Sequence, residues 1–363
     1  MLEHMLCKKG CRQRAEILKQ LAIKPMRTSE LVEVLMRKPG AKYAYIYKHL
    51  EILKRAKLIY KKGGKWRITT DKKRRIYEAL DPCILKLYLK LYVAGASTAL
   101  KVLRTLPVRI PFLLSAGLYW DGAKFNLKDK LDFASETFVD SGAQQFYKKF
   151  NTFSYPYSPK EYVDFALRVR ADLLASLDLP LDILTPRGLS VQEGIKRTTE
   201  YGVDVFAYAE KLGIKTKIVP VVQGYNDPTQ WLESIDQYLA HGIDAKVWGI
   251  GSLCMTKSRR LVNSVLKAVR HRLKSRCIHV FGLALDSLRE VYRYIDSFDT
   301  SAWIYWAKKD GAVLLWDSLK HRFIHLQARD GKRYDTLSLM RANIESLMSM
   351  VRDLSNLKHL TLL

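Results

Sequence analysis

Short apolar runs alternate with amphipathic stretches along most of the chain from about Ile110. The amphipathic stretches repeat apolar positions every three to four residues, and this spacing predicts helices over about residues 158–170, 190–212, 228–242 and 256–273. The runs between them are short and bounded by polar residues, and they predict buried strands. These runs are IPFLLS, TFVD, LLASLD, IVPVVQ, AKVWGI and IHVFGL.

Strand–helix alternation over about 200 residues is typical of an α/β fold with parallel strands. A closed (β/α)8 TIM barrel fits this length, and a doubly wound open sheet stays possible. We place the barrel at residues 108–363, with a C-terminal amphipathic helix that begins near Leu337. A connecting helical segment at 76–107, with its helix over about 75–104, would join the barrel to a smaller N-terminal domain.

The first 75 residues follow a different pattern, with three predicted helices and then a predicted hairpin. Apolar positions recur at helical spacing after Arg12, in RTSELVEVLMRK and in KYAYIYKHLEILKRAKLI. The segment LIYKKGGKWRITT then predicts two strands joined at Gly63–Gly64. This order indicates a winged helix-turn-helix domain at residues 1–75, whose third helix would enter the major groove of DNA. A basic helical module used for protein contacts is the alternative.

Basic and aromatic side chains of this domain are candidate contacts to nucleic acid. Residues 1–80 hold 22 Lys and Arg against 7 Asp and Glu, so more than half of the net charge of +26 lies in less than a quarter of the chain. This distribution favours a polyanionic partner. On the exposed face of the third helix and on the hairpin wing we expect Lys42, Tyr43, Tyr45, Lys48, His49, Lys61, Lys62, Lys65 and Arg67.

A second basic stretch runs from Lys257 to Lys274 and contains no acid. A solvated helix face is the usual explanation of such a run. Because no counter-charge lies within this one, we expect Arg259 and Arg260 to face phosphates.

Other features narrow the class of protein. The chain has no run of about 18 uncharged apolar residues, and its N-terminal sequence lacks the apolar core of a signal peptide. The five cysteines are scattered, apart from Cys7 and Cys11, as reduced thiols are. We therefore expect a soluble, cytoplasmic protein with no membrane partner.

Carboxylates, an amide and small polar residues end several of the predicted strands. In a barrel the carboxyl ends of the strands meet at one mouth, where catalytic groups lie. A single Asp at a strand end is usually a helix cap or a turn former, but three acids and an amide at equivalent edges favour a shared site. The positions are Asp140, Ser141, Gly142, Asp178, Gln223, Gly251, Ser252 and Asp299.

Several carboxylates, without a Cys–His cluster, a glycine-rich phosphate loop or a serine-nucleophile elbow, indicate glycosidic bond chemistry. One acid attacks or stabilises the cationic sugar carbon, and another manages the proton of the leaving group. An amide and nearby backbone groups can bind the edge of a flat heterocycle.

Five motifs, in this order over roughly residues 108–310, resemble the tRNA-guanine transglycosylase superfamily: VDSGAQQF, SLDLP, VPVVQGY, WGIGSL and DSFDTSAW. That superfamily has a (β/α)8 barrel and exchanges a guanine in nucleic acid for a 7-deazaguanine. The resemblance implies that Asp299 is the nucleophile and Asp140 the general acid/base. It implies a base pocket made by Ser141, Gly142, Asp178, Gln223, Gly251, Ser252 and Leu253. We expect Gly142 and Ala143 to be small because a planar base lies close to the backbone there.

The chain departs from the superfamily in ways that bear on the substrate. Gly142–Ala143 replaces a double glycine, and Gly251–Ser252–Leu253 replaces the segment GGL. After Asp299 the chain has no cysteine, so the C-terminal zinc site of the tRNA enzymes is absent and we expect no cofactor. A winged helix, a module usually associated with duplex DNA, stands in place of the RNA-binding domain of archaeal tRNA enzymes.

The resemblance is therefore strongest to the DNA-modifying branch, the DpdA-type DNA-guanine transglycosylases. The expected partners are DNA and a free 7-deazaguanine base, 7-cyano-7-deazaguanine or a relative. A tRNA-guanine transglycosylase of unusual architecture would share the mechanism but act on tRNA. A DNA-binding regulator with a catalytically inactive barrel is a third possibility, although the intact Asp140, Asp178 and Asp299 argue against it.

Overall fold

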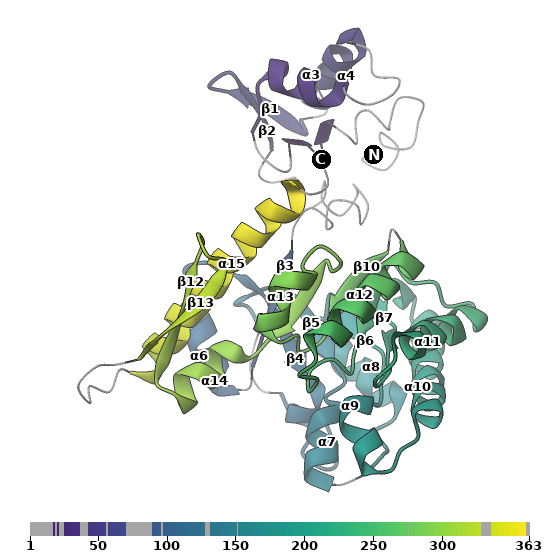
Figure 1. Cartoon of the computed structure of the whole chain (residues 1–363). Helices are drawn as coiled ribbons and strands as arrows, with labels where there is room; N and C mark the ends of the chain where they lie inside the picture. Colours follow the sequence, from purple (N-terminus) through teal and green to yellow (C-terminus); the bar gives the residue numbers. More distant parts are fainter. Residues whose placement is uncertain are drawn as a thin grey trace. The chain divides into compact units, whose positions relative to one another are not determined.

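The chain divides into two compact units, Met1–Leu87 and Tyr88–Leu363 (Figure 1). The smaller unit contains the basic N-terminal segment, and the larger contains the strand–helix alternation. The computed structural model describes residues 17–18, 20–21, 25–36, 43–55, 57–69, 89–95, 97–127, 131–150, 152–274, 276–327 and 335–360.

Helices and one hairpin make up the described part of the N-terminal unit. The helices are α3 (Thr28–Met36) and α4 (Tyr43–Arg55), and residues 17, 18, 20 and 21 are also helical. The strands β1 (Ile59–Lys62) and β2 (Lys65–Ile68) pair antiparallel. This order of elements follows the apolar spacing of the sequence, and its assignment as a winged helix stays a prediction.

The hairpin turn and a tryptophan hold this unit together. Gly63 and Gly64 both have positive φ, +60° and +73°, as a two-residue turn between twisted strands requires. The main chain of Trp66 forms an isolated antiparallel β-bridge with that of Met26, and the Trp66 Nε1 donates to Thr28 Oγ1 at 3.1 Å. The buried apolar residues of the unit are Ile17, Leu18, Leu21, Met26, Leu31, Leu35, Ile46, Leu50, Leu53, Leu58, Ile59 and Trp66.

A parallel sheet forms the centre of the larger unit. Among the described residues nine strands pair in the order β7-β6-β5-β4-β3-β11-β10-β9-β8. Only Pro220 separates β7 from β8, and β7 pairs with β6 while β8 pairs with β9. The sheet is therefore a nearly closed barrel, consistent with a TIM-type fold. Its strands are β3 (Lys90–Ala94), β4 (Ile110–Ser115), β5 (Ala134–Asp140), β6 (Leu173–Ala175), β7 (Ile218–Val219), β8 (Val221–Val222), β9 (Val247–Ile250), β10 (Cys277–Val280) and β11 (Ser297–Thr300).

The first barrel strand corrects the sequence prediction. Residues 90–94 form β3, which pairs with β4 and β11, where a connecting helix over about 75–104 was expected. The middle of β3 is buried on both faces, and periodicity alone does not distinguish such an apolar run from a buried helix. The barrel thus begins before residue 108, and α6 (Ser97–Arg104) follows its first strand. Residues 75–88 of the expected helix lie outside the described part of the chain.

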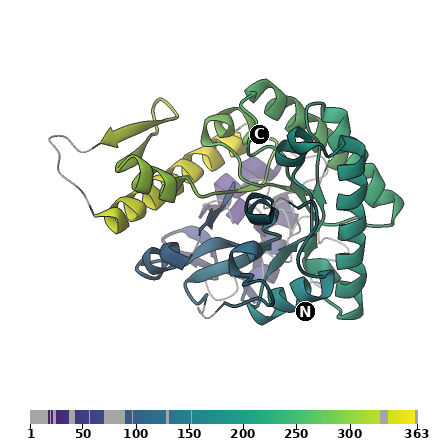
Figure 2. The same ribbon diagram turned by 90° about the horizontal axis from the view of Figure 1, so that it is seen from below.

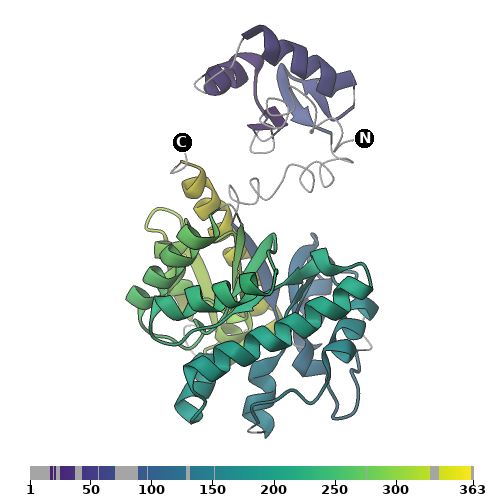
Figure 3. The same ribbon diagram turned by 90° about the vertical axis from the view of Figure 1, so that its right-hand side faces the viewer.

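Helices cover the outside of the barrel, and successive ones pack side by side (Figures 2 and 3). Two of them begin with a capping box followed by Pro, at Ser158 and Asp227, which fixes where each helix starts. The helices are α7 (Ala143–Phe150), α8 (Pro159–Arg168), α9 (Leu181–Leu184), α10 (Val191–Lys211), α11 (Pro228–Ala240), α12 (Arg259–Leu273), α13 (Leu285–Val291) and α14 (Ala302–Lys309), with 3-10 turns at Ala116–Tyr119, Thr185–Arg187 and Lys215–Lys217.

A hairpin and a long helix complete the larger unit. The hairpin pairs β12 (Ala312–Asp317) with β13 (Arg322–Gln327), and α15 (Thr336–Leu360) packs against β12 and α14. The buried Asn343 of α15 joins the elements: its amide oxygen accepts from Leu314 N at 2.6 Å, and its amide nitrogen donates to Trp303 O at 3.2 Å. The sequence predicted the terminal helix but not the hairpin.

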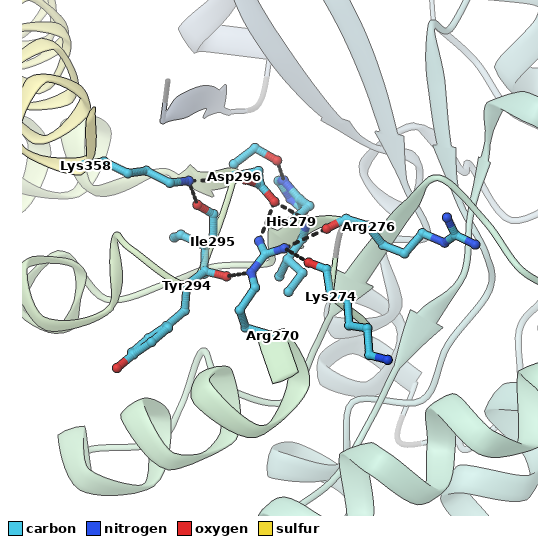
Figure 4. Close-up of polar contacts among 10 residues, drawn as sticks. Arg270, Lys274, Arg276, His279, Tyr294, Ile295, Asp296 and Lys358 are labelled. Carbon is cyan, nitrogen blue, oxygen red and sulfur yellow. Dashed lines mark hydrogen bonds and ion pairs between the residues drawn. The ribbon is translucent and has the colours of Figure 1, made fainter. Parts of the chain in front are cut away.

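A buried ion cluster lies at the amino end of β11 (Figure 4). Asp296 accepts from Arg270 Nη2 of α12 at 2.5 Å and from Lys358 Nζ of α15 at 3.2 Å. The Ile278 amide donates to the same carboxylate at 2.9 Å. Arg270 also donates to the main-chain oxygens of Tyr294, Lys274 and Arg276. The cluster ties α12, α15 and β11 together at one point.

Aromatic and aliphatic side chains fill the barrel interior, including Tyr92, Leu113, Phe138, Ala175, Val219 and Val221. Among the residues that the structure describes, none of the helices combines the length and the apolar character that crossing a membrane requires.

Candidate active site

A cavity of about 620 Å³ opens at the carboxyl ends of the barrel strands. This volume falls within the range of pockets that bind small molecules. Residues predicted from the strand ends meet here because parallel strands bring their carboxyl ends to one edge. The predicted residues that line the cavity are Asp140, Ser141, Gly142, Asp178, Gln223, Gly251, Ser252 and Asp299.

Leu253 corrects the prediction for the loop after β9. Its side chain is buried in the core between barrel and helices and does not line the cavity. Ser252 precedes it with φ +57°, a conformation that few non-glycine residues adopt. The superfamily pattern has glycine at this position. The Ser252 hydroxyl compensates by accepting the Leu181 amide at 2.8 Å and donating to Gln223 Oε1.

A chain of hydrogen bonds links the polar residues that follow four strands, β5, β6, β8 and β9. Ser141 Oγ donates to Asp178 Oδ1 at 2.7 Å, and Gln223 Nε2 donates to Asp178 Oδ2 at 2.5 Å. Gln223 Oε1 in turn accepts from Ser252. Tyr155 holds the Asp178 main chain, with its hydroxyl donating to Asp178 O at 2.6 Å. These contacts fix the orientation of both the carboxylate and the amide before any ligand binds.

Two carboxyl groups of the cavity bind protons more tightly than ordinary aspartates. Burial, together with the negative charge of Asp299, raises the pKa of Asp140 to about 6. Burial raises the pKa of Asp178 to about 7, and the charge of Asp140 adds to this effect. Hydrogen bonds from Gly142 and Ser141 to these carboxylates oppose the shifts only in part. At neutral pH the pair can therefore both donate and accept a proton.

Asp299 lies on β11 opposite Tyr92 of β3, and its side chain is buried at the cavity. Its Oδ1 accepts the Gly282 amide at 2.9 Å. His279 Nε2 lies 3.3 Å from the same oxygen, without the geometry of a hydrogen bond. Among the described residues no hydrogen bond reaches Oδ2, so one carboxylate oxygen is held and the other is left for a ligand.

Gly142 is small for a reason that the sequence did not indicate. Its φ is +75°, and an added Cβ would lie 2.2 Å from the Gly117 nitrogen. The close backbone approach between Gly142 and Gly117 therefore requires glycine, independently of any base. The turn also aims the Gly142 amide at Asp140 Oδ1, at 3.0 Å.

One family model matches part of this barrel. Residues 161–319, from α8 to the turn after β12, match DpdA, described as deoxypurine in DNA protein A. This confirms the resemblance to the DNA-modifying transglycosylase branch. The DpdA match contains Asp178, Gln223, Gly251, Ser252 and Asp299, and it supports a DNA-modifying transglycosylase at the level of the family. A comparison with curated proteins finds no match.

Several residues of the cavity were not predicted from the sequence. Asp182 lines it, and its Oδ2 accepts the Met255 amide at 3.0 Å. Burial raises the pKa of Asp182. Asp182 follows Asp178 by four residues, in LDLPLD, and this second acid close to a strand end is the signal for it in the sequence. The other unpredicted lining residues that bear on function are Gly282, Ser301, Tyr305, Lys308 and Lys309.

The predicted nucleic-acid contacts of the N-terminal unit differ in how exposed their side chains are. His49 is buried, with 6% of its surface exposed, so it does not lie on the outer face of α4 and that prediction is wrong. His49 directly follows the exposed Lys48, and neighbouring residues of a helix point to different sides of it. Lys42 lies outside the described residues, and so do the side chains of Tyr43 and Tyr45. On the hairpin Lys61 and Lys62 are exposed, and Lys65 and Arg67 are half-buried.

The basic helix α12 has counter-charges on its neighbours. Arg259 lies 3.5 Å from Asp286 and 4.0 Å from Glu290, and Arg272 lies 2.7 Å from Asp236. The sequence run lacks acids, but the adjacent helices supply them, so the argument from missing counter-charge does not hold for Arg259. Contacts of Arg259 and Arg260 to phosphates stay a prediction. Arg260 is exposed.

Within the described ranges no group of three or more His, Cys, Asp or Glu side chains could hold a metal ion. The side chains that line the cavity bring carboxylates, amides, hydroxyl groups and two lysines to it.

Proposed function

We propose that this protein exchanges guanine in DNA for a 7-deazaguanine base, 7-cyano-7-deazaguanine or a relative. The observation that carries the proposal is the convergence of Asp140, Asp178 and Asp299 with Gln223 on one cavity of a DpdA-like barrel. The acids come from three different strand ends, and the family match supplies DNA modification as the process.

The chemistry is a double displacement at the sugar. Asp299 Oδ2 attacks the anomeric carbon, the N-glycosidic bond breaks, and a glycosyl ester to Asp299 forms. Asp140 gives its proton to the departing guanine, which its raised pKa allows near neutral pH. The incoming base then returns a proton to Asp140 and displaces the ester. The net result retains configuration and needs no external energy, because one N-glycosidic bond replaces another.

The base is recognised by groups whose orientation is already fixed. Asp178 accepts from N–H donors of the base when ionised. Gln223 uses one N–H on Asp178 and one lone pair on Ser252, so one donor and one lone pair stay available to a ligand. Gly251 leaves space beside this amide, since a Cβ there would lie 2.3 Å from Gln223 Nε2.

DNA is the proposed polymer because of charge and domain content. The N-terminal unit would act as a winged helix, with α4 in the major groove and Lys61 and Lys62 of the hairpin along phosphates. The target nucleotide must leave the base stack, because a duplex shields the anomeric carbon from Asp299. The winged helix would supply affinity through phosphates while the barrel carries out the exchange.

Mass spectrometry of nucleosides from the DNA and tRNA of cells that express the protein tests this function. We expect a 2′-deoxy-7-deazaguanosine nucleoside in DNA with the wild-type chain and none with Asp299→Ala. The modified nucleoside in tRNA alone would reject DNA as the substrate. Its absence from both nucleic acids, in cells that synthesise deazapurines, would reject the exchange.

A further inference from the structure

We propose that one face of α14 binds the DNA strand next to the target nucleotide; this rests on the proposed function. Ser301, Ile304, Tyr305, Lys308 and Lys309 all line the cavity. They are spaced three or four residues apart and so form one helical face. Since α14 begins two residues after Thr300 of β11, this face leads directly outward from Asp299.

The face is long enough for more than one nucleotide. Seven residues separate Ser301 from Lys308, which is about 10 Å along a helix. Successive phosphates on one strand of B-DNA are about 3.4 Å apart along the axis. A strand whose target sugar lies at Asp299 can therefore extend along α14 by at least one further nucleotide.

The acidic and the basic side chains of the cavity lie in different parts of it, as a bound DNA strand with its phosphates requires. The four acids of the lining are Asp140, Asp178, Asp182 and Asp299, around the position of the base and sugar. Among the described residues that line the cavity, the cations are Lys308 and Lys309, at the outer end of α14. Anionic phosphates are thus kept away from the acids and attracted to the lysines.

Tyr305 offers a stacking surface between these two regions. It is 49% exposed although it is a large aromatic residue. Lys309 Nζ donates to its hydroxyl at 2.5 Å and lies 4.9 Å from the ring centroid, and Trp306 meets the ring edge-on at 5.6 Å. A ring that is held in place and exposed can stack on an unpaired base of any identity.

The contribution of α14 to DNA binding can be measured by the incorporation of labelled guanine into DNA. This assay does not require knowledge of the natural deazapurine, because the exchange is reversible. For Lys308→Ala/Lys309→Ala we expect the KM for DNA to rise about tenfold, and the slope of log KM against log salt to fall by about 1 to 2. The matched control is Lys211→Ala/Lys246→Ala, which removes the same charge at exposed positions at the other end of the barrel. We expect wild-type KM and slope for the control.

Tyr305→Ala, compared with Tyr305→Phe, tests the stacking surface. We expect a KM increase of about 5- to 100-fold for Ala and less than about threefold for Phe, with kcat unchanged in both. Unchanged KM in both the lysine and the Tyr305→Ala variants, while the wild type incorporates guanine, would overturn the inference alone. A wild type that incorporates no guanine would overturn the proposed function and this inference with it.

His279 carries a second and independent inference: we infer that it is a positioning residue for Asp299. The imidazole is fully buried in the barrel, between the rings of Tyr92, Phe138 and Phe281 at 5.5, 4.9 and 4.5 Å. Nδ1 lies 3.0 Å from Ser297 Oγ, and Nε2 lies 3.3 Å from Asp299 Oδ1. His279 Nε2 is buried and makes no hydrogen bond, which costs free energy of folding. Its position beside Asp299 therefore indicates a function.

The neighbours of the ring decide its tautomer. An unprotonated Nε2 would set its lone pair against the carboxylate of Asp299 in the apolar interior, which is repulsive. The proton therefore lies on Nε2, and Ser297 donates to Nδ1. Nε2–H and the Gly282 amide then hold Oδ1 from two sides and leave Oδ2 directed to the sugar. We expect the 3.3 Å contact to tighten into a hydrogen bond when substrate binds, as catalytic hydrogen bonds do.

Replacement of His279 separates positioning from packing. In guanine incorporation we expect His279→Phe to lower kcat about 10- to 100-fold with the KM for DNA within about twofold of wild type. His279→Gln, whose amide N–H can reach the same oxygen, should recover most of the kcat. Ser297→Ala removes only the donor to Nδ1 and should lower kcat about three- to tenfold.

A folded His279→Phe with wild-type kcat, or His279→Gln no better than His279→Phe, would overturn the inference. If His279→Phe does not fold, Ser297→Ala decides, because wild-type kcat in that variant is incompatible with the assigned tautomer. Cooperative thermal unfolding of each variant establishes its fold. Guanine incorporation by the wild type keeps this outcome distinct from failure of the proposed function.

Discussion

Asp296 and Asp299 are two buried acids three residues apart, at opposite ends of β11, and their surroundings differ in charge. Asp296 accepts from the cations of Arg270 and Lys358 and from a backbone amide (Figure 4). Asp299 accepts one backbone amide, the imidazole of His279 lies 3.3 Å from it, and its charge adds to that of Asp140. The negative charge of Asp296, just before β11, is balanced by two cations, whereas the negative charge of Asp299 has no cation beside it among the contacts of the described residues.

This difference separates an acid that supports the fold from acids that can react. A buried carboxylate with two cationic partners is held in place by them and ties together the elements that carry them. Burial raises the pKa of carboxylates that line a cavity, and neighbouring like charges raise it further, as at Asp140 and Asp178. Charge compensation therefore assigns Asp296 to stability and the cavity acids to chemistry.

The largest expected effect is on the compensated acid. Asp296→Ala leaves the half-buried Arg270 and the buried Lys358 without their anion, and we expect it to lower the free energy of unfolding by about 3–5 kcal/mol. Urea denaturation measures this loss. The control Asp244→Ala breaks a half-exposed pair with Arg276 and should cost less than about 1 kcal/mol. Equal losses in the two variants would contradict the distinction.

Removal of the charge of Asp140, a buried acid in the cavity, should raise the free energy of unfolding instead of lowering it. Asp140→Asn keeps an acceptor for the Gly142 amide but removes a charge that burial disfavours. Because the folded pKa of Asp140 lies above its unfolded value, the wild type loses stability as pH rises from about 4 through 6. We expect Asp140→Asn to be more stable than wild type by about 1 kcal/mol at pH 8, a figure reduced for access to the cavity.

Thermal unfolding of Asp140→Asn at several pH values checks this gain, which should shrink as pH falls toward 4. Guanine incorporation by the same variant should fall about 100-fold or more, since no proton can be transferred at that position. A variant that is less stable than wild type at pH 8 would show that the charge of Asp140 is compensated after all.

The smallest effect is expected at Lys358, the second cation of the cluster. Burial lowers its pKa, so the fold already disfavours its charged form. Lys358→Met retains the stem, and Asp296 keeps Arg270 and the Ile278 amide. We expect the free energy of unfolding to change by less than about 1 kcal/mol. A loss as large as that of Asp296→Ala would mean that Lys358, rather than Arg270, compensates the acid.

Much of the barrel could be predicted because strands and helices have different apolar spacings. β4, β5, β9 and β10 lie within or across the runs expected to be strands. β3 was missed because both of its faces are buried, which removes the alternation that marks a strand. The hairpin β12–β13 was missed as well.

The sequence by itself determined which residues end the strands: parallel strands share one edge, so Asp140, Asp178 and Asp299 had to approach one another once a barrel formed. Only the tertiary structure decided the charge around each acid, because the partners come from distant elements. Arg259 meets acids of α13, His49 turns inward, and Gly142 lies against Gly117. Local spacing encodes which way a side chain points along its own element, whereas contacts between elements depend on how the whole chain packs.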